Sequence, residues 1–577
     1  MSRVRRLAAA ALGSALLVAC APPPDLPGEP EAVVFPAQNR PDVRGTSGAL
    51  SSDHPLATAA GYEVLLRGGN AIDAAITMAG VLAVVRPHMN GVGGDAFMLY
   101  YDAAGGAVSA LNGSGRAGAL ATPAFFQEAG DTTMPQVGPR SVSVPGAVRA
   151  WEDALARFGT ISLAEALAPG IRYAREGFPV STRLAADIEE QSGSLDDAGR
   201  EQYLPAGAPP PVGSLLKNPA LARTLERIAR EGADGFYQGP VAQSLSALLE
   251  ARGGYLRTGD FRAHQSQWVE PLEGRYQGYR MLVMPPNTQG FAQLQQFAMA
   301  EDFDLVGMGW GSADYWHTLL EIKKLAFADR DAWAADPDKA QVPLSQLLDP
   351  EYLTERARMV DPAHAASDVT TGVPRAGAIA AGGGHGDEAD GGDTVYLTVV
   401  DRWGNAVSWI QSLFAGFGSG VFDPETGVVL QNRGALFTLE EGHPNQVAPG
   451  KRPYHTLSPM MALHGDGALA FTLGTPGGDS QTQSILAITN NLLLFGMTPQ
   501  EAIEAPRYRG NPGFSVSLED RIPADVRMEL EQRGHRIRVV HGWTATFGGA
   551  QMILVDRDNG VRTAASDPRR EAYSIAY

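Results

Sequence analysis

A threonine at the start of a strand-rich region is the strongest candidate nucleophile in the sequence. Thr394 follows Asp393 and a glycine-rich segment, and it begins a predicted strand at residues 394–400. A threonine hydroxyl is a weak nucleophile at neutral pH and needs an adjacent base. If the bond between Asp393 and Thr394 is broken, the new α-amino group of Thr394, with a pKa of about 8, can accept the hydroxyl proton.

A serine and a glycine pair fit the same chemistry. Ser412 ends a second predicted strand at 406–412, where its hydroxyl would face Thr394 and orient the amine. Gly477 and Gly478 follow a predicted strand at 467–473, and successive N–H groups without side chains between them can form an oxyanion hole. The alternative for this glycine pair is a tight turn with no catalytic role.

The elements around these residues predict a mixed protein of the α/β or α+β class. Helices are predicted at 70–85, 148–158, 219–231 and 315–335, and further strands at 96–101, 279–283 and 550–555. Residues 371–392 are rich in glycine and predict a flexible linker, or simply an interdomain loop, immediately before Thr394.

Composition argues against several functional classes. The net charge of −18 is spread along 577 residues, whereas binding to nucleic acid needs clustered lysine and arginine. Phosphate-loop, H-E-x-x-H and G-x-S-x-G motifs are missing, the eleven histidines show no ligand spacing, and one cysteine cannot build a thiolate site. We therefore predict a small soluble molecule as substrate, and the missing motifs argue against metal and nucleotide sites.

The N-terminus has the pattern of an export signal. Basic residues precede an apolar stretch at 7–18, and Leu-Val-Ala-Cys at 17–20 resembles a bacterial lipobox. This predicts a signal peptide at 1–20, lipidation of Cys20, a proline-rich tether at 21–44, and an exported, periplasmic lipoprotein held at the membrane through its lipid. The alternative is an ordinary signal peptide in which Cys20 is incidental.

Ten short motifs together resemble the γ-glutamyltranspeptidases, a family of the N-terminal-nucleophile hydrolase superfamily, from about residue 45 to the C-terminus. The motifs are DHPLA at 53–57, GGNAIDAA at 68–75, GGDAF at 93–97, PPNTQG at 285–290, ADR at 328–330, GDT at 392–394, KRP at 451–453, SP at 458–459, TPGG at 475–478 and ASDPR at 565–569. Their common order and spacing make the resemblance far more specific than any single motif.

The resemblance implies a proenzyme that cleaves itself before Thr394. The products would be a large subunit, 45–393, and a small catalytic subunit, 394–577, interlocked in a four-layer αββα sandwich. Thr394 would attack the substrate carbonyl, Gly477 and Gly478 would donate to the oxyanion, and Ser412 would stand where the family keeps a helper threonine. Water or an amine would then release the acyl group of the small-molecule amide, and the resemblance implies no metal and no organic cofactor.

The sequence departs from the family where glutathione-cleaving members bind the glutamyl group. Ser114 takes the position of the family's carboxylate-binding arginine, Arg116 lies two residues further on, and His455-Thr456 replaces a serine pair. The positions that bind the α-amino group hold Phe414, Arg433 and Leu436, which would repel an ammonium.

This pattern resembles the divergent branch that includes oxamate amidohydrolase-like and cephalosporin acylase-like members. We predict an acyl group with a carboxylate but no α-ammonium, bound by Arg116, Arg433 and His455 in a pocket with Ser114 and Thr456. Either arginine is alternatively a structural ion-pair partner. Two other functions stay open: a true glutathione hydrolase or γ-glutamyltransferase, which also needs Thr394, and a non-catalytic solute-binding lipoprotein, which does not.

Overall fold

The fold is carried by two large antiparallel sheets. The computed structural model describes residues 38–367, 369–374 and 393–577, and within these ranges each sheet has seven strands. Sheet A has the strand order β1 (Val43–Gly45), β20 (Arg562–Ser566), β19 (Gln551–Val555), β15 (Leu469–Gly474), β14 (Met460–Leu463), β9 (Tyr279–Val283) and β8 (Leu272–Tyr276). Sheet B has the order β21 (Tyr573–Ala576), β2 (Ala49–Ser52), β10 (Asp393–Val400), β11 (Ala406–Phe414), β3 (Asp95–Asp102), β4 (Ala107–Gly113) and β7 (Gln267–Val269).

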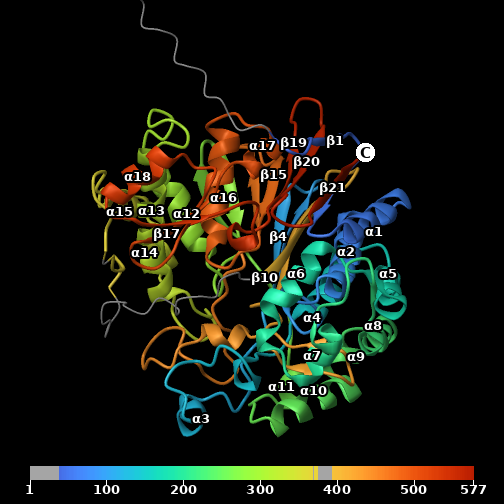
Figure 1. Ribbon diagram of the computed structural model, residues 1–577. Coiled ribbons are helices and arrows are strands. Elements are labelled where there is room, and N and C mark those ends of the chain that lie inside the picture. Colours follow the sequence, from blue (N-terminus) through green and yellow to red (C-terminus); the bar gives the residue numbers. More distant parts are fainter. Residues whose placement is uncertain (1–37, 368, 375–392) are drawn as a thin grey trace, which may run out of the picture. The chain divides into compact units, whose positions relative to one another are not determined.

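Helices cover the outer face of each sheet, as Figure 1 shows. Those on sheet B are α1 (Pro55–Leu66), α2 (Ala71–Val85) and α4 (Ala147–Phe158), and those on sheet A are α12 (Gly290–Ala300), α16 (Ser480–Leu493) and α17 (Pro499–Glu504). The long helix α13 (Ala313–Trp333) packs on α12, and α5 (Leu163–Glu176) packs on α2. The two sheets contact each other directly through β10, β11 and β2 on one side and β15, β19 and β20 on the other. The expected αββα layering is therefore confirmed.

Strand β10 is buried on both faces, which is what a sheet between two layers requires. Alternate side chains point to opposite faces of a strand. Val395 and Leu397 pack into the core beneath the helices, whereas Tyr396 and Val400 pack into the core between the sheets. Because Thr394 is in phase with Tyr396, its side chain faces sheet A.

Both sheets contain strands from the two sides of the Asp393–Thr394 bond. In sheet B, β10 pairs with β2 and β11 pairs with β3. In sheet A, β1 pairs with β20 and β14 pairs with β9. A break after Asp393 would therefore divide the chain without dividing either sheet.

The remaining helices and strands lie around these layers. The helices are α3 (Pro123–Glu128), α6 (Thr182–Gln191), α7 (Asp197–Tyr203), α8 (Pro219–Glu231), α9 (Asp234–Tyr237), α10 (Gly239–Ala251), α11 (Thr258–Arg262), α14 (Leu344–Leu347), α15 (Pro350–Ala357) and α18 (Ala524–Gln532). The strands are β5 (Phe178–Pro179), β6 (Leu215–Leu216), β12 (Phe422–Asp423), β13 (Val428–Val429), β16 (Tyr508–Gly510), β17 (Ser515–Glu519) and β18 (Arg536–Val540). Among the helices of the described ranges, none has both the length and the apolar composition of a membrane span.

The predicted elements agree closely with the observed ones. The strand at 279–283 and the helix at 219–231 match to the residue, and the buried helix predicted at 70–85 is α2. Its one acidic residue, Asp73, completes a capping box with Asn70, so the charge serves the helix N-terminus. The helix predicted at 315–335 begins and ends two residues earlier, at Ala313–Trp333. Cys20 and residues 375–392 of the predicted linker lie outside the described residues.

Candidate active site

The two candidate hydroxyls face each other across neighbouring strands. Thr394 and Ser412 are direct partners in the antiparallel register of β10 and β11, and both are buried. The Thr394 hydroxyl donates a hydrogen bond of 2.9 Å to Ser412 Oγ. The backbone N–H of Phe414 donates to the same oxygen at 2.8 Å. We call Thr394 and Ser412 the hydroxyl pair.

The hydroxyl of Ser412 contacts the peptide bond that precedes Thr394. It donates a hydrogen bond of 2.8 Å to the carbonyl oxygen of Asp393. Such a bond withdraws electron density from the carbonyl and favours attack on its carbon. The Asp393 carboxylate is held separately by Arg570, whose Nη2 lies 3.3 Å from Oδ1. The backbone carbonyl and the side-chain carboxylate of Asp393 are thus both held by hydrogen-bonding partners.

The glycine pair lies in the loop that joins β15 to α16. The last residue of β15 packs on the strand of the nucleophile candidate, because a Cβ on Gly474 would lie 2.3 Å from the ring of Tyr396, two residues after Thr394. Gly477 has φ +122°, which side chains rarely tolerate, and a Cβ there would lie 2.3 Å from Ser480 Oγ. Gly478 also has positive φ, +56°. Gly477 therefore requires glycine, and the positive φ of Gly478 favours it.

A carboxylate on a third strand, β3, lies next to the hydroxyl pair. Asp95 begins β3 and is the direct register partner of Ser412. Its Oδ1 accepts a hydrogen bond of 3.1 Å from the N–H of Gly115. Burial raises the pKa of Asp95 to about 7, although the positive charge of Arg433 opposes the shift.

Arg433 is buried beside this carboxylate and beside the strand end that holds Ser412. Its Nε lies 3.8 Å from Asp95 Oδ2, and its guanidinium carbon lies 4.7 Å from the centre of the Phe414 ring. Its Nη1 donates a long hydrogen bond of 3.5 Å to Thr456 Oγ1. Within the described part of the chain, Nε and Nη2 have no hydrogen-bond acceptor. Burial lowers the pKa of Arg433 to about 10, so it is still a cation at neutral pH.

Ser114 and His455, two of the positions that depart from the family pattern, contact each other. Ser114 Oγ and His455 Nε2 are 2.8 Å apart, and Ser114 Oγ also accepts a hydrogen bond of 3.0 Å from Asn287. His455 Nε2 is 3.7 Å from Asp95 Oδ2. We call Asp95, Ser114, Arg433, His455 and Thr456 the charged cluster.

His455 contributes a neutral ring to this cluster. Burial holds the pKa of the imidazole well below its usual value, and the positive charges of Arg433 and Arg452 lower it further. His455, which the sequence predicted among the anion-binding groups, is thus uncharged at neutral pH. In the described residues His455 Nδ1 has no hydrogen-bond partner, so the ring retains one polar atom for a ligand.

Arg116 lies apart from the charged cluster. Its guanidinium pairs with Asp336 at 3.1 Å and with Asp338 at 2.7 Å, and it donates to the carbonyl of Gly450 at 2.9 Å. The side chain is about one-third exposed. This geometry favours the structural alternative for Arg116, in which it fixes the loop before Arg452.

The comparison with known proteins decides the family. The family model described as Gamma-glutamyltranspeptidase matches residues 57–577. The chain belongs to the γ-glutamyltranspeptidase family. Its members are hydrolases that use an N-terminal nucleophile, so the protein is an enzyme of that type, and the expected family is confirmed.

Within the γ-glutamyltranspeptidase family, the chain is similar to members of different specificity. It is 37% identical to the "Glutathione hydrolase-like YwrD proenzyme" of Bacillus subtilis (strain 168), over 92% of this chain and 99% of that one. It is 36% identical to the "Oxamate amidohydrolase proenzyme" of Klebsiella pneumoniae, with the same coverage. Among solved structures, the cephalosporin acylase from Bacillus halodurans matches with a TM-score of 0.86 and 35% identity, over 96% of this chain and 99% of that one.

Asp95 is the site residue that the sequence analysis missed. It lies in the GGDAF motif, which by itself indicated only the family resemblance. One signal was available: Asp95 precedes an otherwise apolar strand, and a carboxylate that starts a buried strand needs a partner. Identifying that partner as Arg433, on a loop more than 300 residues later in the chain, required the structure.

Proposed function

We propose that this protein is an autoprocessing amidohydrolase that releases a small acyl group carrying a free carboxylate. One observation carries the proposal. The hydroxyl of Thr394 donates to Ser412, and the hydroxyl of Ser412 donates to the carbonyl oxygen of Asp393. A nucleophile and an activated carbonyl therefore lie together at the bond whose cleavage would free the Thr394 amine.

We propose that maturation uses this geometry. Thr394 Oγ attacks the carbonyl carbon of Asp393 while Ser412 stabilises the developing charge on the oxygen. The hydroxyl proton passes to the departing nitrogen, which becomes the α-amino group of Thr394, and Asp393 remains attached as an ester. Water then hydrolyses the ester. The products are a large subunit ending at Asp393 and a small subunit, 394–577, that share both sheets.

Catalysis on substrates uses the same nucleophile. The freed α-amino group of Thr394 acts as the base for its own hydroxyl, which attacks the substrate amide to form an acyl-enzyme. The N–H groups of Gly477 and Gly478 stabilise the oxyanion, and water or an amine then takes the acyl group. Ser412 positions the Thr394 hydroxyl throughout.

Arg433 supports a substrate with a carboxylate. It is a buried cation whose Nη2 lacks an acceptor within the described residues, and it is linked to Ser412 both through Phe414 and through Asp95. A carboxylate on the acyl group would supply that acceptor and form a charge-assisted hydrogen bond. The amidohydrolase and acylase names among its relatives agree with such a substrate.

A second candidate function, hydrolysis of γ-glutamyl amides, is favoured by one observation. Within the described residues, Asp95 Oδ2 accepts no hydrogen bond, so it offers a negative atom to an α-ammonium group. The adjacent positive charge of Arg433, 3.8 Å away, opposes this role. We therefore place γ-glutamyl substrates second.

The test combines intact mass spectrometry of the purified protein with two matched chromogenic substrates. Glutaryl-p-nitroanilide and γ-glutamyl-p-nitroanilide differ by the α-amino group alone. We expect two fragments divided before Thr394 and faster turnover of the glutaryl compound. Faster turnover of the γ-glutamyl compound would support the second candidate, and an uncut inactive chain would contradict the proposal.

We also propose that the protein is exported and anchored through a lipid on Cys20. The basic start, the apolar stretch at 7–18 and the lipobox-like 17–20 support this. Replacing Cys20 by Ser should release the protein from the membrane fraction. Unchanged fractionation would favour an ordinary signal peptide.

A further inference from the structure

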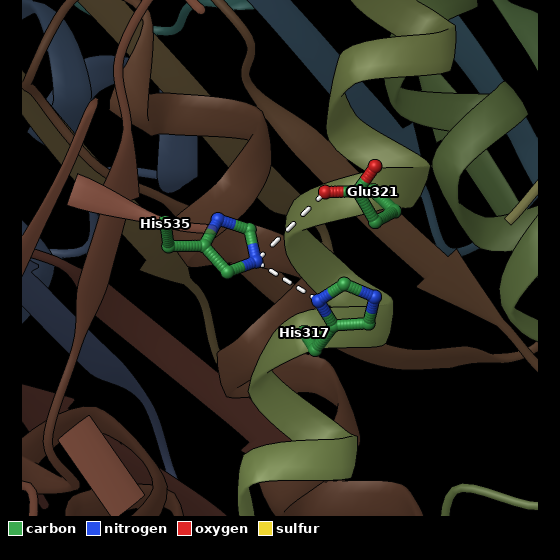
Figure 2. Close-up of side chains that lie close together, drawn as sticks. All are labelled: His317, Glu321 and His535. Atoms are coloured by element: carbon green, nitrogen blue, oxygen red, sulfur yellow. Dashed lines mark hydrogen bonds and ion pairs between the residues drawn. The ribbon is translucent and has the colours of Figure 1, made fainter. Parts of the chain in front are cut away.

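Two histidines and a glutamate lie together in a region that the proposed chemistry does not use. His317 and Glu321 are on the same face of helix α13, and His535 precedes strand β18. Figure 2 shows the two imidazole rings facing each other with the Glu321 carboxylate beside them. His317 Nδ1 is 2.9 Å from His535 Nε2, which is 3.9 Å from Glu321 Oε1. All three residues are buried.

The hydrogen bonds around the rings leave the right atoms for a metal ion. His317 Nε2 is 2.7 Å from the carbonyl oxygen of Asp361, so Nε2 carries the proton and Nδ1 presents its lone pair to His535. A ligating histidine usually donates its other N–H to a carbonyl or carboxylate in this way. In the described part of the chain His535 Nδ1 has no partner, so it can carry that ring's proton while Nε2 binds a metal.

We propose that His317, Glu321 and His535 form a binding site for a divalent transition-metal ion, with Zn²⁺ as the best fit. Two imidazoles and one carboxylate are ligands that suit Zn²⁺. One ligand atom from each residue lies within 4.8 Å of the others. Tetrahedral coordination at about 2.1 Å places two ligand nitrogens roughly 3.4 Å apart, so the rings need to separate by only about half an ångström.

Metal binding at Glu321 would have to displace a contact with a neighbouring cation. Lys324 Nζ donates to Glu321 Oε1 at 2.7 Å and to the carbonyl of Ala366 at 2.9 Å. Arg533 is the other nearby cation, and it is paired with Asp314. Binding replaces the Lys324 contact at Oε1, while Lys324 keeps Ala366 and Glu321 Oε2 keeps the Ala366 N–H at 3.0 Å.

The site joins elements that are distant in sequence, because His317 and His535 are 218 positions apart. Helix α13 packs against α18, and His535 follows α18. Strands β16, β17 and β18 form a small three-stranded sheet. A metal ion would therefore link the helices outside sheet A to this small sheet. Three protein ligands leave a fourth tetrahedral position for water, as in open zinc sites.

The test is titration of the full-length, chelator-treated protein with ZnCl₂ in a calorimeter, with CoCl₂ absorption to report coordination geometry. We expect one ion per chain and a rise in the thermal midpoint on binding. His535→Gln and His317→Gln should each weaken binding by roughly tenfold or more. The matched control is His541→Gln, an exposed histidine paired with Asp520, which should bind normally.

A second variant keeps the test decisive if loss of a buried histidine unfolds the chain. Lys324→Gln removes the cation that competes for Glu321 and should tighten Zn²⁺ binding. Absence of Zn²⁺ binding by the unaltered protein would overturn the proposal. Equal weakening in His541→Gln, or Zn²⁺ affinity that does not respond to Lys324→Gln and to either ligand variant, would also overturn it.

Discussion

The hydroxyl pair and the charged cluster are adjacent, but they are built in opposite ways. Thr394 and Ser412 are held by strand register, and their hydroxyls have partners at 2.8–2.9 Å. The charged cluster comes from strand ends and loops, and Nη2 of Arg433 and Oδ2 of Asp95 have no hydrogen bond within the described residues. In the function that we propose, the reaction therefore depends on residues held by the sheet, whereas substrate choice depends on polar atoms that have no partner within the described residues.

Replacing Thr394 of the hydroxyl pair should have the largest effect of the variants considered. Thr394→Ala removes the attacking oxygen, so we expect an uncut chain and a loss of amidase activity of at least about 10³-fold. Electrophoresis and steady-state kinetics measure both. Thr398→Ala is the matched control, because Thr398 is buried in the same strand. Normal processing of Thr394→Ala would show that the hydroxyl pair is not the reaction centre.

Removing the buried cation should affect binding and leave maturation intact. Arg433→Leu deletes a charge-assisted hydrogen bond, so kcat/KM for glutaryl amides should fall by about 10- to 100-fold. A neutral butyryl amide should be hydrolysed almost as before. Arg116→Ala, which breaks ion pairs outside the cluster, should leave the ratio of the two rates unchanged. Equal losses for both substrates in Arg433→Leu would make Arg433 structural.

The helper hydroxyl should have a smaller effect, confined to the reaction. Ser412→Ala removes one hydrogen bond to Thr394 and one to the Asp393 carbonyl, so processing and kcat should slow by roughly tenfold. Ser412→Thr retains a hydroxyl and should largely restore both rates. KM should change little in either variant. A large change in KM, with kcat unaltered, would place Ser412 in the charged cluster instead.

The smallest expected effect is the pH dependence of binding. Burial raises the pKa of Asp95 to about 7, so the carboxyl is mostly neutral below pH 7 and becomes negative above it. The negative form offsets Arg433, so KM for a glutaryl amide should rise by about threefold as pH increases through 7. Asp95→Asn should remove this rise, and a neutral substrate should lack it. A rise that persists in Asp95→Asn would assign it to another group.

The sequence predicted the hydroxyl pair better than the charged cluster, for a physical reason. Strand periodicity identified Thr394 and Ser412 on two neighbouring predicted strands, and the structure supplied the register that pairs them directly. Nothing local distinguishes Arg433 from Arg116: both follow glycine-containing or polar turns and carry the same charge. The difference is their surroundings, since Arg116 has two aspartates within 3.1 Å and Arg433 has one at 3.8 Å. The sequence did not indicate the His317–Glu321–His535 cluster for the same reason, because its third member comes from a distant segment of the chain.

The mixing of strands from either side of residue 393 within each sheet has a consequence for a cleaved molecule. Separating the pieces would require breaking the β2–β10, β2–β21, β3–β11, β9–β14 and β1–β20 pairings at once. Dilution therefore does not dissociate them as it would a complex of two folded proteins. Heat would disrupt both pieces in one irreversible event whose midpoint is insensitive to protein concentration, and the two purified fragments would not reassemble by simple mixing.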